Sequence, residues 1–178
     1  WSPDGSRIAY VRSAGDTDGA EIFVHWLATG QDARITQLPA SPNHLRWSPD
    51  GRRLAFAMQV AAEPPVVSEQ ELDKPEGAEW AEPARITDRL YHEADGSGYI
   101  QPGFSHVFVV PADGGTARQV TSGDFHHRAP AWSADGATLY VTGNRAEDWE
   151  YDYRNSEVYA VDVATGRTTA LTSTAGPD

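Results

Sequence analysis

The chain has 178 residues, enough for one domain, or at most two, with a hydrophobic core. Its 14 Lys and Arg against 26 Asp and Glu give a net charge of −12, which argues against nucleic acid or an anionic membrane surface as a partner. No apolar run reaches the roughly 18 residues of a membrane span. The absence of cysteine excludes disulfides and thiolate metal sites, and the abundant Gly, Pro and Trp favour an all-β fold.

Two sequence motifs each occur three times along the chain. The first is Trp-Ser-Pro-Asp-Gly, with Ala in place of Pro in the last copy, and its copies begin at Trp1, Trp47 and Trp132. The second is a 15-residue stretch with a central glycine turn and a final Thr, at residues 22–36, 107–121 and 158–172. Self-similarity with a period of about 42 residues is typical of propeller blades. We expect the three repeat tryptophans to pack between such blades.

Each repeat predicts four antiparallel strands. Ser-Pro-Asp-Gly favours a tight turn because proline fixes φ, Asp bonds its own backbone and glycine accepts a positive φ. In the second repeat we expect strands at residues 43–47, 52–58, 105–110 and 117–121. In the third repeat we expect them at residues 129–132, 138–142, 157–161 and 168–172. The first strand of the first repeat would precede Trp1, so we expect the chain to be part of a longer protein.

The predicted fold is all-β, a partial β-propeller of about three four-stranded antiparallel, WD-like blades of which the first is incomplete. The blades span residues 1–36, 43–121 and 129–172, and the middle one carries an insertion at residues 59–104. In an up-and-down sheet, alternate connections lie on opposite faces. The long connections therefore share one face, which we expect to be the contact face; they are residues 13–21, 37–42, 59–104, 122–128 and 143–156.

The repeats resemble the propellers of the prolyl oligopeptidase family of serine peptidases and of the TolB-like periplasmic proteins. The stretches 86–91, 94–99 and 105–110 are similar to acylaminoacyl-peptidase-like and dipeptidyl-aminopeptidase-like members. This resemblance implies a non-catalytic propeller segment that gates and docks peptide substrates for a C-terminal α/β-hydrolase domain, which is absent from this chain. The implied partners are that domain, the remainder of the propeller and a peptide. The alternative is a TolB-like scaffold that binds proteins. Relatives occur in the cytoplasm and in the periplasm.

No stretch carries a complete catalytic or metal motif. Residues 103–107 lack the last glycine of a nucleophile elbow, and Asp16 begins a turn that lacks the terminal Glu of a calcium loop. The pair His126-His127 is interpreted as part of a solvated connection. We therefore expect no catalytic residue, metal or cofactor in this chain.

The acidic connection at residues 145–152 supplies the candidate substrate contacts, because some relatives use propeller carboxylates to hold a peptide's amino group. The candidates are Arg145, Glu147, Asp148 and Glu150. A solvated charged loop is the competing interpretation.

Overall fold

The computed structural model describes residues 1–13, 15, 19–63, 76–77, 79, 86–96 and 98–174. Residues 16–18 of the acidic turn that begins at Asp16, and residues 64–75 and 80–85 of the predicted insertion, lie outside these residues. All regular secondary structure in the described ranges is β-strand, which confirms the predicted all-β class. The described residues include no helix long and apolar enough to cross a membrane.

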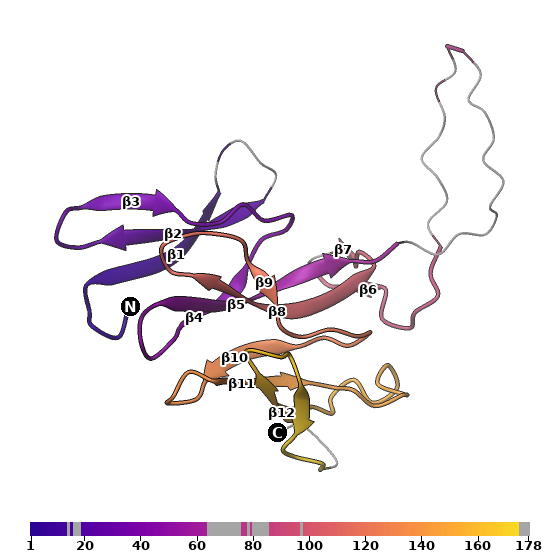
Figure 1. Cartoon of the computed structure of the whole chain (residues 1–178). Helices are drawn as coiled ribbons and strands as arrows, with labels where there is room; N and C mark the ends of the chain where they lie inside the picture. The colour runs from indigo at the N-terminus through magenta and orange to yellow at the C-terminus, as the bar shows by residue number, and fades with distance from the viewer. Residues whose placement is uncertain are drawn as a thin grey trace.

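The strands form three antiparallel sheets and one small hairpin (Figure 1). Sheet 1 has the order β1 (Arg7–Ser13), β2 (Ala20–Trp26), β3 (Gln31–Arg34). Sheet 2 has the order β4 (Asn43–Trp47), β5 (Arg53–Ala61), β8 (Gly103–Pro111), β9 (Arg118–Gln119). Sheet 3 has the order β10 (Arg128–Trp132), β11 (Thr138–Gly143), β12 (Glu157–Asp162), β13 (Thr168–Ala170). The hairpin consists of β6 (Glu93–Ala94) and β7 (Gly98–Tyr99).

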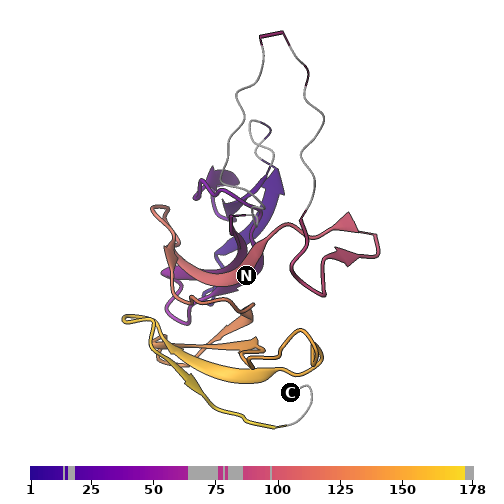
Figure 2. The ribbon, with the colours of Figure 1, turned by 90° about the vertical axis from the view of Figure 1, so that its right-hand side faces the viewer.

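The sheets lie side by side, with sheet 2 between the other two (Figures 1 and 2). The expected strands of the second and third repeats are all present, but their lengths differ from the prediction. The pair β5–β8 is longer than predicted, running from Arg53 opposite Pro111 to Ala61 opposite Gly103. The outer strands β9 and β13 are shorter, with two and three residues.

Sheet 2 buries both of its faces, because successive side chains of a strand point to opposite sides. In β5, Leu54 and Phe56 join a core cluster with Ile22 and Val24 of sheet 1. The intervening Ala55 joins a second cluster with residues of β8 and of sheet 3, namely Val107, Val109, Leu139, Val141, Tyr159 and Val161. The alternation that predicted a strand therefore supplies two separate cores, one at each junction between sheets.

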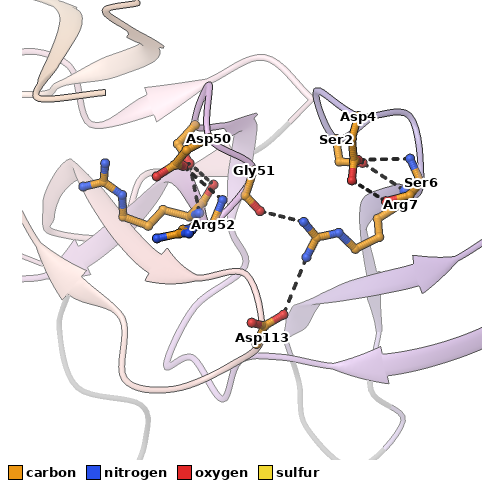
Figure 3. Close-up of polar contacts among 10 residues, drawn as sticks. Ser2, Asp4, Ser6, Arg7, Asp50, Gly51, Arg52 and Asp113 are labelled. Carbon is orange, nitrogen blue, oxygen red and sulfur yellow. Dashed lines mark hydrogen bonds and ion pairs between the residues drawn. The ribbon is translucent and has the colours of Figure 1, made fainter. Parts of the chain in front are cut away.

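The Ser-x-Asp-Gly turn has the same hydrogen bonds in every sheet. The hydroxyls of Ser2, Ser48 and Ser133 donate to the aspartate two residues later at 2.5, 2.5 and 2.6 Å. Each serine oxygen also accepts the backbone N–H five residues later, at 2.9, 2.9 and 3.0 Å. Hydrogen bonds from Ser2 and Ser6 lower the pKa of Asp4 to about 2 (Figure 3). The third turn forms without proline, as the sequence predicted.

The threonine that ends each 15-residue motif also has one repeated role. The hydroxyl oxygens of Thr36, Thr121 and Thr172 accept the backbone N–H of Ile22, Val107 and Val158 at 3.0, 2.9 and 2.8 Å. Each bond ties the last residue of the motif to its first. In sheets 1 and 3 the same hydroxyls donate to glutamates, Glu21 and Glu157. The corresponding residue of sheet 2 is His106, whose Nδ1 lies 3.3 Å from the Thr121 hydroxyl.

An arginine clasp joins each pair of neighbouring sheets. Arg7 of sheet 1 donates to the Gly51 carbonyl at 2.7 Å and lies 4.8 Å from the Trp47 ring centre (Figure 3). Arg53 of sheet 2 repeats these contacts with Gly136 and Trp132, at 2.8 and 4.8 Å. Both arginines follow their own repeat tryptophan by six residues.

The clasp confirms that Trp47 and Trp132 pack between sheets, as predicted. The prediction is wrong for Trp1, which is 72% exposed because no described segment covers its ring. The two partly buried indoles differ in their N–H groups. That of Trp132 donates to the Arg46 carbonyl at 3.1 Å, whereas that of Trp47 has no hydrogen-bond partner among the described residues.

A left-handed residue recurs in the first strand of sheets 2 and 3. His44 and Ala129 have φ of 53° and 51°, and each lies three residues before its repeat tryptophan. The register of both strands shifts around these residues, between Asn43 and Arg46 and between Arg128 and Ala131. Each shift is a β-bulge at the same place in the repeat.

Candidate functional site

A cleft of about 650 Å³ opens between sheets 2 and 3, on the side opposite the Ser-x-Asp-Gly turns. Its walls come from three of the long connections and the strand ends that flank them: residues 86–103, 126–128 and 142–156. These connections were predicted to share one face, and the cleft confirms that they do. In Figure 2 the hairpin β6–β7 of the insertion projects to the right of sheet 2.

Two glycines allow the backbone to approach closely beside the cleft. A Cβ on Gly103 would lie 2.1 Å from the Val60 carbonyl oxygen, and the φ of this residue is +129°. A Cβ on Gly143 would lie 2.5 Å from the His126 carbonyl oxygen. Since backbone atoms cannot yield as a flexible side chain can, only glycine fits these positions without displacement.

Three aromatic rings pack together at the cleft. The ring centres of Phe104 and His126 are 5.3 Å apart, and the ring centre of Trp149 lies 6.3 and 6.0 Å from them. The guanidinium of Arg89, from the insertion, lies 4.4 Å from the Phe104 ring centre. This cluster, the ring cluster below, joins residues from β8, the connection before β10 and the connection after β11.

His126 is a neutral hydrogen-bond donor at neutral pH. Its Nδ1 accepts the backbone N–H of Ser105 at 3.0 Å, so the proton of the neutral ring resides on Nε2. Burial, together with the positive charges of Arg128 and Arg89, lowers the pKa of His126 to about 4. Both guanidinium groups therefore act on the same ring.

The cleft has a positive charge balance although the chain has a net charge of −12. Arg89 and Arg128 line it, and Asp88 is the one acidic residue among the lining residues that the structure describes. Within the described part of the chain, neither arginine has an acidic side chain within ion-pair distance. The cleft is thus suited to an anionic group.

The four predicted contact residues lie beside the cleft but do not line it. Arg145 is half-buried, with its guanidinium 5.3 and 5.4 Å from the ring centres of Phe125 and Tyr159. Glu150 accepts the backbone N–H of Leu90 at 3.4 Å and so ties its loop to the insertion. Glu147 and Asp148 are exposed. Their assignment as substrate contacts stays a prediction.

Two aromatic residues of the long connection 143–156 line the cleft instead. Trp149 belongs to the ring cluster, and Tyr153 stacks on Tyr91 of the insertion with ring centres 6.1 Å apart. The Asn144 amide donates to the Asp152 carbonyl at 2.8 Å, which closes the loop. The occurrence of Trp149 and Tyr153 within a charged stretch was the sequence feature that could have indicated these contacts.

His127 is fully buried, so the interpretation of a solvated connection is wrong at this residue. Among the described residues, neither of its ring nitrogens has a partner with full hydrogen-bond geometry, and its ring centre lies 5.5 Å from that of the buried His106. Burial lowers the pKa of His127 to about 4 and also lowers that of His106. Among the described residues, no three His, Asp or Glu side chains gather closely enough to hold a metal ion.

In sequence, the chain is similar to peptidases. It is 24% identical to the uncharacterized peptidase YuxL of Bacillus subtilis over 83% of its length, and 27% identical to dipeptidyl-peptidase 5 of Porphyromonas endodontalis over 97%. These matches cover 22% and 25% of the two relatives, so the chain spans a quarter of their length or less. No family model matches the chain.

In structure, the chain is similar to propeller regions of solved proteins. An acylaminoacyl peptidase of Pyrococcus horikoshii matches 97% of the chain with a TM-score of 0.65 and 16% identity, over 24% of its own length. A protein described as a TolB of Agrobacterium tumefaciens matches 99% of the chain with a TM-score of 0.58 and 17% identity, over 48% of its own length. The resemblance to peptidases of the prolyl oligopeptidase type is confirmed by these comparisons, and the all-β sheets match propeller folds.

Proposed function

We propose that this chain is the non-catalytic propeller segment of a serine peptidase, where it docks and gates peptide substrates for a separate α/β-hydrolase domain. In this proposal the three sheets are three blades of an incomplete ring, the first with three of its four strands. The peptidase relatives, each about four times as long as their match to this chain, support a further domain in the whole protein.

The observation that carries the proposal is the cleft on the long-connection face. It combines about 650 Å³ of space with the ring cluster, two arginines and a neutral histidine donor. A mostly apolar concavity with a few polar groups is the usual form of a ligand site. None of its described residues forms a Ser-His-Asp arrangement, which fits a role in binding rather than in bond cleavage.

The alternative is a TolB-like propeller that binds proteins as a scaffold, and the similarity to the Agrobacterium protein favours it equally. The two functions differ in what the natural protein contains. A peptidase requires a nucleophile elbow, G-x-S-x-G, in the remainder of its reading frame, whereas a TolB-like scaffold does not.

Cleavage of aminoacyl-p-nitroanilides by the natural full-length protein tests the proposal. We expect turnover that is abolished when the elbow serine is replaced by Ala. Trp149→Ala in the same protein is expected to raise KM severalfold with little change in kcat, because the ring cluster binds substrate but does not touch the bond that breaks. A full-length protein without turnover would contradict the proposal and favour the scaffold.

A further inference from the structure

We propose that the cleft between sheets 2 and 3 binds peptides by a carboxylate, which Arg89 and Arg128 hold, while a neighbouring apolar side chain packs on the ring cluster. This inference rests on the proposed function for the peptide nature of the ligand. The carboxylate can be the C-terminus of the peptide or an acidic side chain, and the experiment below distinguishes the two sources.

The first step is the state of the two arginines. A guanidinium offers five N–H donors and prefers to bind a carboxylate through two parallel hydrogen bonds. The Arg89 guanidinium carbon lies 4.4 Å from the Phe104 ring centre, and none of the described acidic side chains lies within ion-pair distance of this arginine. Arg128 is exposed and likewise has no acidic partner within the described residues.

The second step is that the positive charges of Arg89 and Arg128 lie at the same cleft. Arg89 comes from the insertion of sheet 2 and Arg128 from the start of β10, yet both line one cleft and both act electrostatically on His126. The Nδ1 of His126 is occupied by the Ser105 N–H, so Nε2–H is the ring donor left for a ligand. An anion placed among these groups would receive two charged donors and one neutral donor.

The third step is the apolar surface next to these donors. Trp149 belongs to the ring cluster, and the stacked Tyr91 and Tyr153, which also line the cleft, are 53% and 58% exposed. A side chain that covers such rings removes apolar area from water at about 25 cal/mol per Å². The ligand therefore combines a carboxylate with an apolar or aromatic group, as a peptide that ends in Phe or Leu does.

A second cleft provides an internal contrast. It also measures about 650 Å³ and lies between sheets 1 and 2, lined by residues such as Leu38, Pro39, Met58 and Phe108. None of the described residues that line it is ionisable, so these residues offer no charged donor to a carboxylate. The selectivity for acids is therefore expected to depend on the arginines of the first cleft alone.

Calorimetric titration of the natural full-length protein with N-acetylated tripeptides tests the proposal. The first peptide ends in Phe as the free acid, the second in Phe amide, and the third in Phe amide with Glu before it. We expect the acid to bind at least about tenfold more tightly than the amide. Arg89→Gln and Arg128→Gln are each expected to weaken acid binding about tenfold and to leave amide binding unchanged. If the Glu amide peptide binds as tightly as the acid, the carboxylate can be a side chain.

Arg52→Gln is the matched control, because Arg52 is exposed at a turn and lines neither cleft. Arg89→Lys, which keeps the charge but loses the planar fork, is expected to recover part of the affinity and guards against a variant that fails to fold. Equal binding of acid and amide, or acid preference that survives both Gln variants, overturns the inference. Turnover of p-nitroanilides by the same preparation separates the outcomes: turnover without acid preference contradicts the carboxylate site alone, and acid preference without turnover contradicts the peptidase function.

Discussion

The two junctions between sheets share the arginine clasp but differ in the residues that line their clefts on the long-connection face. Sheets 1 and 2 are joined by Arg7 on Trp47 and Gly51, and sheets 2 and 3 by Arg53 on Trp132 and Gly136, with matching distances. On the long-connection face the first junction has a cleft whose described lining residues include no ionisable group. The second junction has a cleft with two arginines and a histidine.

The difference can be followed residue by residue. Counted from the repeat tryptophans, Ser41, Pro42 and Met58 of sheet 2 correspond to His126, His127 and Gly143 of sheet 3. The glutamates Glu21 and Glu157 correspond to His106. The residues that hold the sheets together are thus repeated, whereas those on the long-connection face are specific to one junction. This difference supports the proposal that the ligand binds at the second junction.

Acidification should destabilise the second junction most. Because the pKa values of His126 and His127 are lowered to about 4 from an ordinary 6.5, the unfolded chain takes up protons first. The free energy of unfolding should therefore fall as the pH drops from 6.5 to 4, by at most about 1.4 kcal/mol per pH unit for each ring, and these rings add no further loss below 4. Urea unfolding at several pH values measures this slope.

His127→Phe is the variant that separates this effect from general acid denaturation. It removes two unpartnered buried nitrogens, so it should not reduce stability at pH 7.5 and should flatten the slope between pH 6.5 and 4. An unchanged slope in this variant would show that His127 is not a source of the pH dependence.

Gly143→Ala should cost about 3 kcal/mol of unfolding free energy, because its Cβ would lie 2.5 Å from the His126 carbonyl oxygen. Gly96→Ala is the control: its φ is +78° but no atom lies within 4 Å of the added Cβ, so only about 1 kcal/mol is expected. Chemical denaturation of both variants measures the difference. Equal costs would mean that the backbone beside the cleft adjusts freely.

The clasp should have the same strength at both junctions. Arg7→Ala and Arg53→Ala each remove a charged hydrogen bond and a cation–π contact, for an expected loss of about 2 kcal/mol. Arg7 additionally lies 3.5 Å from Asp113, whose side chain is 88% exposed, so Asp113→Asn should change stability by less than about 0.5 kcal/mol. A large cost for Arg7→Ala that Asp113→Asn reproduces would show that the ion pair, and not the clasp, joins sheets 1 and 2.

The bulges should give the smallest effect. Ala129 has a φ of 51°, which is unfavourable for a residue with a Cβ, so Ala129→Gly should raise the unfolding free energy by about 0.5 kcal/mol. His44→Gly, at the equivalent position of sheet 2, should do the same. Loss of stability in both variants would mean that the side chains contribute more than the left-handed backbone costs.

The repeats predicted the sheets because their motif residues have local physical roles. Ser48 and Asp50 fix a turn through contacts within five residues, and Thr121 closes the motif that begins at Val107. Such short-range interactions can be recognised in the sequence. The clasp of Arg53 on Gly136 could not be predicted in this way, because the two residues are 83 positions apart.

The sequence predicted the face on which the candidate site lies but not the residues that form the site. The placement of long connections indicated where contacts occur, and charge directed attention to Glu147 and Asp148. The cleft instead uses Trp149, Arg89 and His126, which come from three connections and meet only in the folded chain. His127 escaped prediction because burial of a polar ring depends on packing against His106 and Tyr159, which are distant in sequence.

Photo-crosslinking of a short peptide to the natural protein tests the central claim most directly. The peptide ends in p-benzoylphenylalanine as the free acid, and the crosslinked residues are identified by mass spectrometry. We predict crosslinks to residues 86–103 and 143–156 at the second junction, reduced both by excess unlabelled acid and in Arg128→Gln. Crosslinks to residues 36–40 or 115–119 at the first junction, or none within this chain, would contradict the assignment of the second junction as the peptide site.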